Sequence, residues 1–420
     1  MSALKFWTPN AMAHAMMARP RSTGAVCAVT AMFLCHVALA DEFDTVNVVV
    51  GDTLSHDSNV FRVPSNLGPP AGFSSKSDVF NTHFVGLRLN KPYALQRFQA
   101  DITKSAIRYN NFSTLDSDTL NYHAAWLWAL TPRLTGTLST DQTQGQASFA
   151  QFGGTQRNLT TTENTTFSVD GWITGGWHLF GAYTNTEHQT DQPLISSPST
   201  RGHRSEVGIR YDALSGNSVT FTRRRIPSST TDQPLDPINF IDTGATDTET
   251  ELRASWRPTG KSTFDGRLTY REHRSNTFTQ RDFSGVANQL SYSWAPTGKL
   301  TFILSAVRDI QPYVAFGNTI ENASFRVDHT LFMVGSWQTS AKTAVRVRYA
   351  RTQSDFGGPV FAVTGPPRSD DLRSASIAAD WSPRRFVSLS AIISHERRMS
   401  NVGTFEFNDT TASVTAAINF

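Results

Sequence analysis

The chain has 420 residues, of which 39% are hydrophobic and 17% are charged, and its formal net charge at pH 7 is +3. A chain of this length forms either two ordinary globular domains or one large β-barrel. After residue 40 it contains no uninterrupted apolar run long enough for a membrane helix. These properties exclude a helical membrane protein but not a water-filled membrane barrel, in which only alternate residues meet lipid. The high aromatic content of 11% is typical of the aromatic girdles of such barrels.

Residues 1–40 have the pattern of a secretory signal peptide. Residues 24–37 are apolar, and residues 38–40 form an A-x-A cleavage site. The segment before the apolar run contains three basic residues, Lys5, Arg19 and Arg21. We therefore expect an exported chain, residues 41–420, that forms a single domain.

Both cysteines, Cys27 and Cys35, lie within the expected signal peptide. The exported chain would then contain neither a disulfide nor a thiolate metal site. Lipid attachment at Cys35 is an alternative, although Leu34 is larger than the residue that lipoprotein signals place before the cysteine. Removing the three basic signal residues leaves 35 Lys and Arg against 35 Asp and Glu, so the charge gives no indication of a nucleic-acid partner.

The first half of the exported chain contains several segments in which apolar and polar residues alternate, as they do in strands with one apolar face. The strands expected here are residues 43–54, 79–90, 96–109 and the alternating run from Tyr122 to Leu130. Residues 91–93 and 131–133 are expected to form short turns. The segments 56–78 and 110–118 are expected to be longer polar loops.

The second half repeats this organisation. Four alternating strands each end at a tryptophan that precedes a tight polar turn, at Trp256, Trp294, Trp337 and Trp381. Longer polar loops, such as 227–246 and 355–370, separate these hairpins. A repeat of about 40 residues is also found in β-propellers. However, the strands here span about 10–13 residues, as tilted membrane strands do, and globular strands are shorter.

The last strand ends on an aromatic residue. Val414, Ala416, Ile418 and Phe420 alternate with small or polar residues and therefore share one face. This ending resembles the closing strand of bacterial outer-membrane β-barrels, in which the terminal phenylalanine is part of the signal read by the barrel-assembly machinery. The resemblance implies that Phe420 is such an assembly signal.

Together these patterns predict an all-β protein, a transmembrane antiparallel up-and-down β-barrel. The alternating segments give about nine up-down pairs, and hence about 18 strands within a range of 16–18. Both termini are then expected in the periplasm, with the barrel in the outer membrane of a Gram-negative bacterium. Outer-membrane lipid is the partner that this location implies.

The charged residues of the strands are expected to face the lumen, because an arginine that faces lipid at mid-depth costs about 2–4 kcal/mol. This expectation follows if Leu290, Trp294 and Val347 face lipid. The residues that then face inward include Arg88, Arg210, Glu249, Glu251, Arg253, Asp265, Arg267, Arg271, Arg326, Asp328, Arg346, Arg348 and Asp380. Two interpretations remain open: crossed ion pairs that brace the wall, or a solute path that binds sugar hydroxyls or acidic groups.

Catalytic motifs are not evident in the sequence. It contains neither H-E-x-x-H nor G-x-S-x-G. His395 and Glu396 lie where a strand meets a loop, and a lone histidine at a barrel rim is more often solvated. We expect no enzymatic activity, no cofactor and no metal; a Ser/His pair assembled across strands, as in barrel lipases, is the alternative.

A short segment near the start resembles a known family. Residues 57–62, which are Asp57, Ser58, Asn59, Val60, Phe61 and Arg62, match the D-S-N-(V/L)-F-R segment of the EpsL family of outer-membrane β-barrels. The likeness continues in the chain length, the Trp-x-Pro turns and the terminal Phe420. It implies a role in exopolysaccharide biosynthesis and export, with the exopolysaccharide and periplasmic export components as partners.

Three other functions remain open from the sequence. One is a general diffusion porin, which would show a long inward-folded loop and a constriction with opposed charges. Another is a barrel enzyme, which would need a Ser/His/acid set at one rim. The last is a non-conducting scaffold of the secretion machinery.

Overall fold

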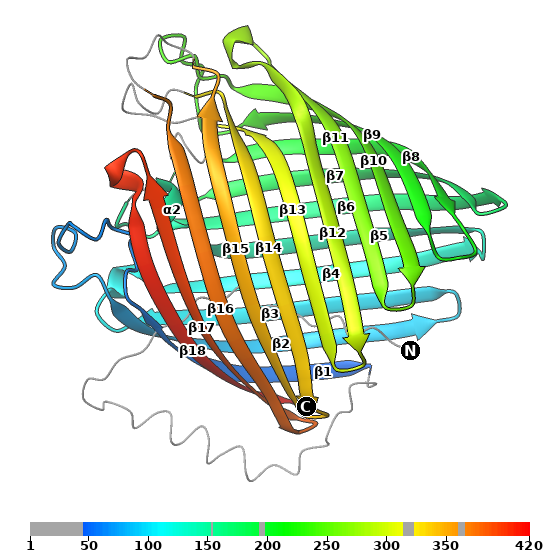
Figure 1. Ribbon diagram of the computed structural model, residues 1–420, viewed down its shortest axis with the longest axis horizontal. Helices are drawn as coiled ribbons and strands as arrows, with labels where there is room; N and C mark the ends of the chain where they lie inside the picture. The colour runs from blue at the N-terminus through cyan, green and yellow to red at the C-terminus, as the bar shows by residue number, and fades with distance from the viewer. Residues whose placement is uncertain (1–44, 153, 193–197, 314–322, 360–365) are drawn as a thin grey trace.

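The computed structural model describes residues 45–152, 154–192, 198–313, 323–359 and 366–420. They form a single sheet of 18 antiparallel strands that closes into a barrel (Figure 1). The expected signal peptide lies outside the described residues. No helix within the described ranges is long and apolar enough to cross a membrane.

Each strand pairs with the next one along the chain, which confirms the predicted up-and-down topology. The strands contain between 12 and 16 residues. In chain order they are β1 (Val46–Asp57), β2 (Asp78–Tyr93), β3 (Gln96–Tyr109), β4 (Ser117–Thr131), β5 (Leu134–Gln146), β6 (Leu159–Thr174), β7 (Trp177–Thr190), β8 (Thr200–Asp212), β9 (Ser218–Thr230), β10 (Gly244–Thr259), β11 (Ser262–Ser275), β12 (Phe283–Thr297), β13 (Leu300–Pro312), β14 (Phe325–Ser340), β15 (Thr343–Gly357), β16 (Ser369–Arg384), β17 (Val387–Ser400) and β18 (Phe407–Asn419). Four short helical segments lie in the long loops, α2 (Phe149–Phe152), η1 (Ser113–Leu115), η2 (Thr279–Arg281) and η3 (Gly403–Phe405).

The barrel closes where β1 pairs with β18. The register runs from Val49 opposite Asn419 to Asp57 opposite Thr411. Beyond it, Val48 and Phe420 exchange two backbone hydrogen bonds of 2.9 and 2.8 Å. Because the sheet is closed, it has no free edge whose backbone groups would be unpaired in lipid.

Several strands are longer than the sequence predicts. The loop predicted at 227–246 is shorter, because β9 continues to Thr230 and β10 begins at Gly244. Similarly, β15 continues to Gly357 within the segment predicted as the loop 355–370. These extensions are rich in Ser, Thr, Gly and Asp, whose side chains give no apolar alternation. The neighbouring strand pairs with their backbone whatever the side chains are.

The two ends of the barrel differ. Short turns connect the strands at one end, for example residues 94–95 between β2 and β3. Long loops, such as 58–77 and 231–243, lie at the other end, which is at the upper left of Figure 1. The predicted asymmetry of short turns and long loops is therefore present.

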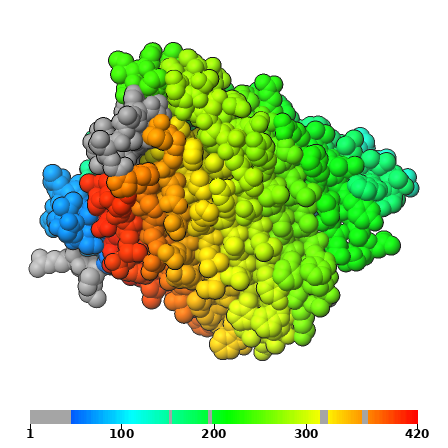
Figure 2. Space-filling model, turned by 45° about the horizontal axis from the view of Figure 1, so that its top comes forward, coloured from blue at the N-terminus to red at the C-terminus, as the bar shows by residue number. Residues whose placement is uncertain are grey.

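The wall has one apolar face. Large apolar side chains at alternate positions, including Leu268, Leu290 and Val347, are exposed by 52%, 58% and 52%. The same face carries a row of exposed tryptophans next to the short turns, at Trp256, Trp294, Trp337 and Trp381. Figure 2 shows this outer face as a continuous surface over the strands coloured green to red. An apolar band bordered by aromatic side chains is typical of the lipid face of a membrane barrel.

Exchanging Val347 and Arg348 tests which face meets lipid. The double substitution V347R/R348V keeps the composition but moves a charge to the exposed apolar face. We expect the free energy of unfolding in bilayers to fall by about 2–4 kcal/mol, the cost of a lipid-facing arginine near mid-depth. The control R348V should change it by only about 0.5 kcal/mol. Equal losses in both variants, measured by urea titration of tryptophan fluorescence, would contradict this assignment.

Candidate functional site: the inner wall of the barrel

The charged residues predicted to face the lumen all lie on the side of the wall opposite the exposed apolar residues. Arg267, for example, is next to Leu268 in β11, and the same alternation holds for the others in their strands. This side is concave, because Arg271 of β11 approaches Asp309 of β13 to 4.0 Å across the intervening strand. The residues therefore line the inner wall, and their role in a solute path stays a prediction.

Arg224 of β9 is the centre of the largest network. Its Nε donates to Glu206 of β8 at 2.8 Å, and its terminal nitrogens donate to Glu251 of β10 at 3.0 and 3.1 Å. Glu251 also accepts a hydrogen bond of 3.2 Å from the Thr269 hydroxyl of β11. Glu251 is buried, so these contacts neutralise a carboxylate that would otherwise be costly to remove from water.

Arg271 continues this network towards β13. Its Nη2 lies 2.6 Å from Glu249 of β10, and its Nη1 lies 4.0 Å from Asp309. Glu249 is also 3.5 Å from Arg224. One connected set of charges therefore joins strands from β8 to β13, which supports the bracing interpretation for these residues.

A second network joins β6, β7 and β8. Asp170 of β6 lies 3.0 Å from Arg210 of β8 and 2.6 Å from His178 of β7. Arg210 also donates from Nε to Asp212 at 2.8 Å. Arg210, a predicted lumen residue, is thus held between two carboxylates.

Four further residues predicted to face the lumen form ion pairs in β14, β15 and β16. Arg326 and Asp328 of β14 are 2.7 Å apart, and Asp328 also accepts a hydrogen bond from Ser354 of β15. Arg346 of β15 lies 2.7 Å from Asp380 of β16. The Arg346–Asp380 pair and the Ser354–Asp328 hydrogen bond therefore join neighbouring strands on the inner face.

Four predicted lumen residues are less tightly held. Arg253 is 57% exposed and lies 3.5 Å from Glu251. Arg253 is directly opposite Arg267 in the register of β10 and β11, and like charges in this position destabilise a sheet. Within the described parts of the chain, no ion pair holds Asp265, Arg267 or Arg348. Ion pairs therefore do not explain Asp265, Arg267 or Arg348.

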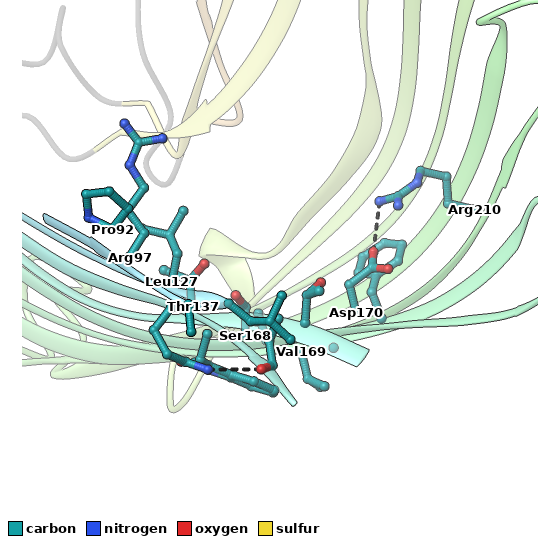
Figure 3. A pocket seen from close by; sticks show the side chains of 18 of the residues that line it. Pro92, Arg97, Leu127, Thr137, Ser168, Val169, Asp170 and Arg210 are labelled. Carbon is teal, nitrogen blue, oxygen red and sulfur yellow. Dashed lines mark hydrogen bonds and ion pairs between the residues drawn. The ribbon is translucent and has the colours of Figure 1, made fainter. Parts of the chain in front are cut away.

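A recess of about 630 Å³ lies in the wall between β2 and β8, near the short turns. In Figure 3, Arg97 lies at one side of the recess, and Arg210 points towards Asp170 at the other. Leu127, Ser168 and other small or apolar side chains form the surface between them. The recess offers an apolar surface with charged groups at its margins, as many small-molecule sites do.

The loop between β5 and β6 reaches over the inner face at the long-loop end. It contains α2, and the Ala150 carbonyl accepts a hydrogen bond of 2.8 Å from Arg398 of β17. Around the barrel, β18 and the strands β1 to β4 lie between β17 and β5. The loop therefore extends from β5 to the inner face of β17 at the long-loop end.

A small apolar core anchors this loop. Phe149 packs with Phe61 of the β1–β2 loop and with Phe112 and Leu115 of the β3–β4 loop. The Phe61 ring centroid is 4.9 Å from that of Phe112 and 5.1 Å from that of Phe149. The prediction of a polar loop at 110–118 is wrong for Phe112 and Leu115, because both are buried around η1 in contact with distant loops.

Residues 57–62, the segment that resembles the EpsL family, contribute to a buried ion-pair cluster. Arg62 lies 2.6 Å from Asp57 and 3.0 Å from Asp409 of β18, and the side chains of both aspartates are 2% exposed. Burial alone would lower the pKa of Arg62, but the two carboxylates outweigh it and raise the pKa above its ordinary value. Arg62 has a φ of +56°, a left-handed conformation that is rare for residues other than glycine.

The other residues of the segment also connect the first loop to the last strand. The Ser58 hydroxyl donates to Asp409 at 3.0 Å. The Asn59 amide donates to the carbonyl oxygens of Val63 and Asn408 at 2.8 and 3.1 Å. Together with Phe61 in the loop core, this segment therefore has a structural role at the point where the barrel closes.

Sequence reasoning missed Arg224, Asp170 and Asp409. Arg224 is the middle residue of an Arg223–Arg225 run, and alternation from the exposed Phe221 would have placed it on the inner face. Asp409 is 351 positions from Ser58, and no local pattern indicates such a partner.

Replacing Arg62 by alanine tests the buried cluster. The substitution leaves Asp57 and Asp409 buried without a cation, so we expect the free energy of unfolding to fall by about 3–5 kcal/mol. The control R88A removes a pair with Asp101 in which both side chains are about half exposed, and should cost at most about 1 kcal/mol. Urea titration in lipid vesicles measures both values, and equal losses would contradict a special role for Arg62.

Comparison with solved structures places this architecture among outer-membrane porins. The chain is similar to Pseudomonas aeruginosa OpdK with vanillate, with a TM-score of 0.50 and 10% identity over 89% of this chain and 99% of that chain. It is also similar to Pseudomonas aeruginosa OccK2 (OpdF) and to Acinetobacter baumannii OccAB3, each with a TM-score of 0.50 and 8% identity over 89% of this chain. These matches cover 97% and 98% of those chains.

No protein-family model and no curated protein matches the sequence, so membership of the EpsL family stays a prediction. The fold agrees with the predicted location in the outer membrane of a Gram-negative bacterium. The chain has the 18-stranded barrel fold of outer-membrane porins.

Proposed function

We propose that this chain is an outer-membrane channel through which small hydrated solutes diffuse. The observation that carries the proposal is the closed barrel of 18 strands with charges of both signs on its inner wall. Barrels of 16–18 strands are wide enough to contain an aqueous channel. A charged inner wall is stable only when it is in contact with water or with paired charges.

The solutes that we propose are small molecules with an acidic group and hydroxyl groups. Arg253 and Arg348 are exposed on the inner wall, and Arg267 has no ion-pair partner among the described residues. Guanidinium groups bind carboxylates and sugar hydroxyls through several donors in one plane. Asp265, which is also exposed, would accept hydrogen bonds from hydroxyl groups of the same solute.

The loop that contains α2 favours small solutes over long polymers. Its hydrogen bond with Arg398 holds it against the inner face of β17, where it would narrow the path at the long-loop end. Vanillate, the molecule named with the OpdK structure, is a small carboxylate of the class proposed here.

Exopolysaccharide biosynthesis or export is a second candidate function. It is favoured by the resemblance of Asp57, Ser58, Asn59, Phe61 and Arg62 to the EpsL segment. In this function the barrel would act with periplasmic export components as a conduit, an accessory channel or a non-conducting scaffold. The α2 loop would then have to move aside for a glycan chain to pass.

We also propose that the C-terminal strand is read by the barrel-assembly machinery, with both termini in the periplasm. Phe420 pairs with Val48 through two backbone hydrogen bonds, so it continues the pairing of β1 and β18 by one residue beyond β18. Its side chain follows the alternation that places Val414 on the apolar face.

Replacing Arg253 and Arg267, which lie directly opposite each other, tests whether the solute path runs along them. In planar bilayers we expect R253Q/R267Q to conduct, with its permeability ratio of chloride to potassium lowered about twofold or more, because charged rings set the ion selectivity of pores. The matched control R223Q/R225Q removes two arginines from the outer face of β9 and should leave the ratio unchanged.

The outcomes separate the candidate functions. An unchanged ratio in R253Q/R267Q would contradict a path along these residues. Conductance that purified exopolysaccharide blocks, but small carboxylates do not, would favour the glycan conduit. A folded, silent barrel would contradict both channels and favour the scaffold.

A further inference from the structure

A row of three arginines crosses the outer face of β15, β16 and β17. Arg351 is directly opposite Arg373, and Arg373 is directly opposite Arg397. All three side chains are exposed. Directly opposed residues of neighbouring strands are about 4.5–5.5 Å apart, so the three side chains begin within about 11 Å of one another.

The row lies on the side of the apolar band that is nearer the long loops. In each strand the arginine is four positions from an exposed apolar residue on the same face, Val347, Ile377 or Ile393. The long loops of outer-membrane barrels are extracellular. The row therefore lies where the apolar band gives way to the headgroups of the outer leaflet, a placement that rests on the proposed outer-membrane function.

The charges of the row are only partly compensated. Asp371 lies 2.7 Å from Arg351 and 3.0 Å from Arg373, so one carboxylate serves two arginines. No ion pair holds Arg397 within the part of the chain that the structure describes. Opposed like charges destabilise a sheet unless an anion bridges them.

Two other outer-face arginines, Arg108 and Arg201, have one carboxylate each. Arg108 pairs with Asp118 at 2.7 Å, and Arg201 pairs with Glu187 at 2.8 Å. The charges of each of these pairs cancel, whereas the three arginines on β15 to β17 share one aspartate and retain an excess of two positive charges. This difference separates the row from ordinary surface ion pairs.

We propose that Arg351, Arg373 and Arg397 form a binding site for the phosphate groups of a glycolipid in the outer leaflet. Guanidinium groups bind phosphate through paired hydrogen bonds, and a row of them can share one phosphate between strands. The neighbouring apolar face, which includes Val347 and Ile377, would contact the acyl chains of the same lipid.

Native mass spectrometry of the intact barrel tests this site, with bisphosphorylated lipid A and its dephosphorylated form as probes. We expect wild type to bind the bisphosphorylated form preferentially. The variant R373Q/R397Q keeps the Arg351–Asp371 pair, and it should lose about fivefold in affinity for each arginine removed, the factor expected for a basic side chain near an anionic lipid surface. The control R108Q should bind as wild type does.

The substitution Asp371→Asn should change the affinity for the lipid in the opposite direction. It adds to the excess of positive charge, so affinity for the bisphosphorylated lipid should rise, whereas a row that merely braces the sheet would only lose stability. Equal binding of both lipid forms, or unchanged binding by R373Q/R397Q, would overturn the proposal. So would a change from oligomer to monomer in R373Q/R397Q without loss of lipid, because it would identify the row as a subunit contact.

Conductance separates this site from the channel. R373Q/R397Q should conduct as wild type does, because the row is on the outer face. A silent wild-type barrel that still binds the phosphorylated lipid would contradict the channel and leave the lipid site supported. A barrel that conducts but binds both lipid forms equally would support the channel and contradict the lipid site.

Discussion

Closure of the sheet is the constraint on which the rest of this structure depends. In lipid, each backbone group of a strand needs a partner within the protein, because water is not available to replace it. The pairing of β1 with β18 supplies the partners at the last open edge. Arg62, in the loop after β1, also connects these two strands, because it forms ion pairs with Asp57 at the end of β1 and with Asp409 in β18. Barrel closure therefore combines a backbone ladder with a buried ion-pair cluster.

The charged residues of the inner wall fall into two groups, those held tightly in ion pairs and those held less tightly or without ion pairs. From β8 to β13 the acidic residues are held by Arg224 and Arg271. Most of these contacts join neighbouring strands, and the contact of Arg271 with Asp309 crosses from β11 to β13. Arg253 and Arg348 instead remain exposed, and Arg267 has no ion pair among the described residues. The tightly ion-paired residues and the residues proposed to contact solute are thus different, which is why the sequence left both interpretations open.

The sequence predicts the strands well because a closed membrane barrel imposes a period of two on almost every segment. The strand predicted at residues 96–109 agrees with β3, and the exposed Val347 and Leu290 lie on the predicted face. The loop core was not predictable, because Phe112 and Phe149 have no local partners and are buried only by contact with another loop. The same holds for the ion pairs of the inner wall, whose members come from separate strands. Alternation predicts which face a residue occupies, but not which residue it contacts.

The Arg62 cluster also has a consequence for the order in which the molecule is made. Its first aspartate and its arginine are synthesised near the start of the chain, and its second aspartate lies in the final strand. A chain without β18 would lack Asp409, and Arg62 would then have only Asp57 as an ion-pair partner. The cluster can therefore form only after β18 has been made and has paired with β1.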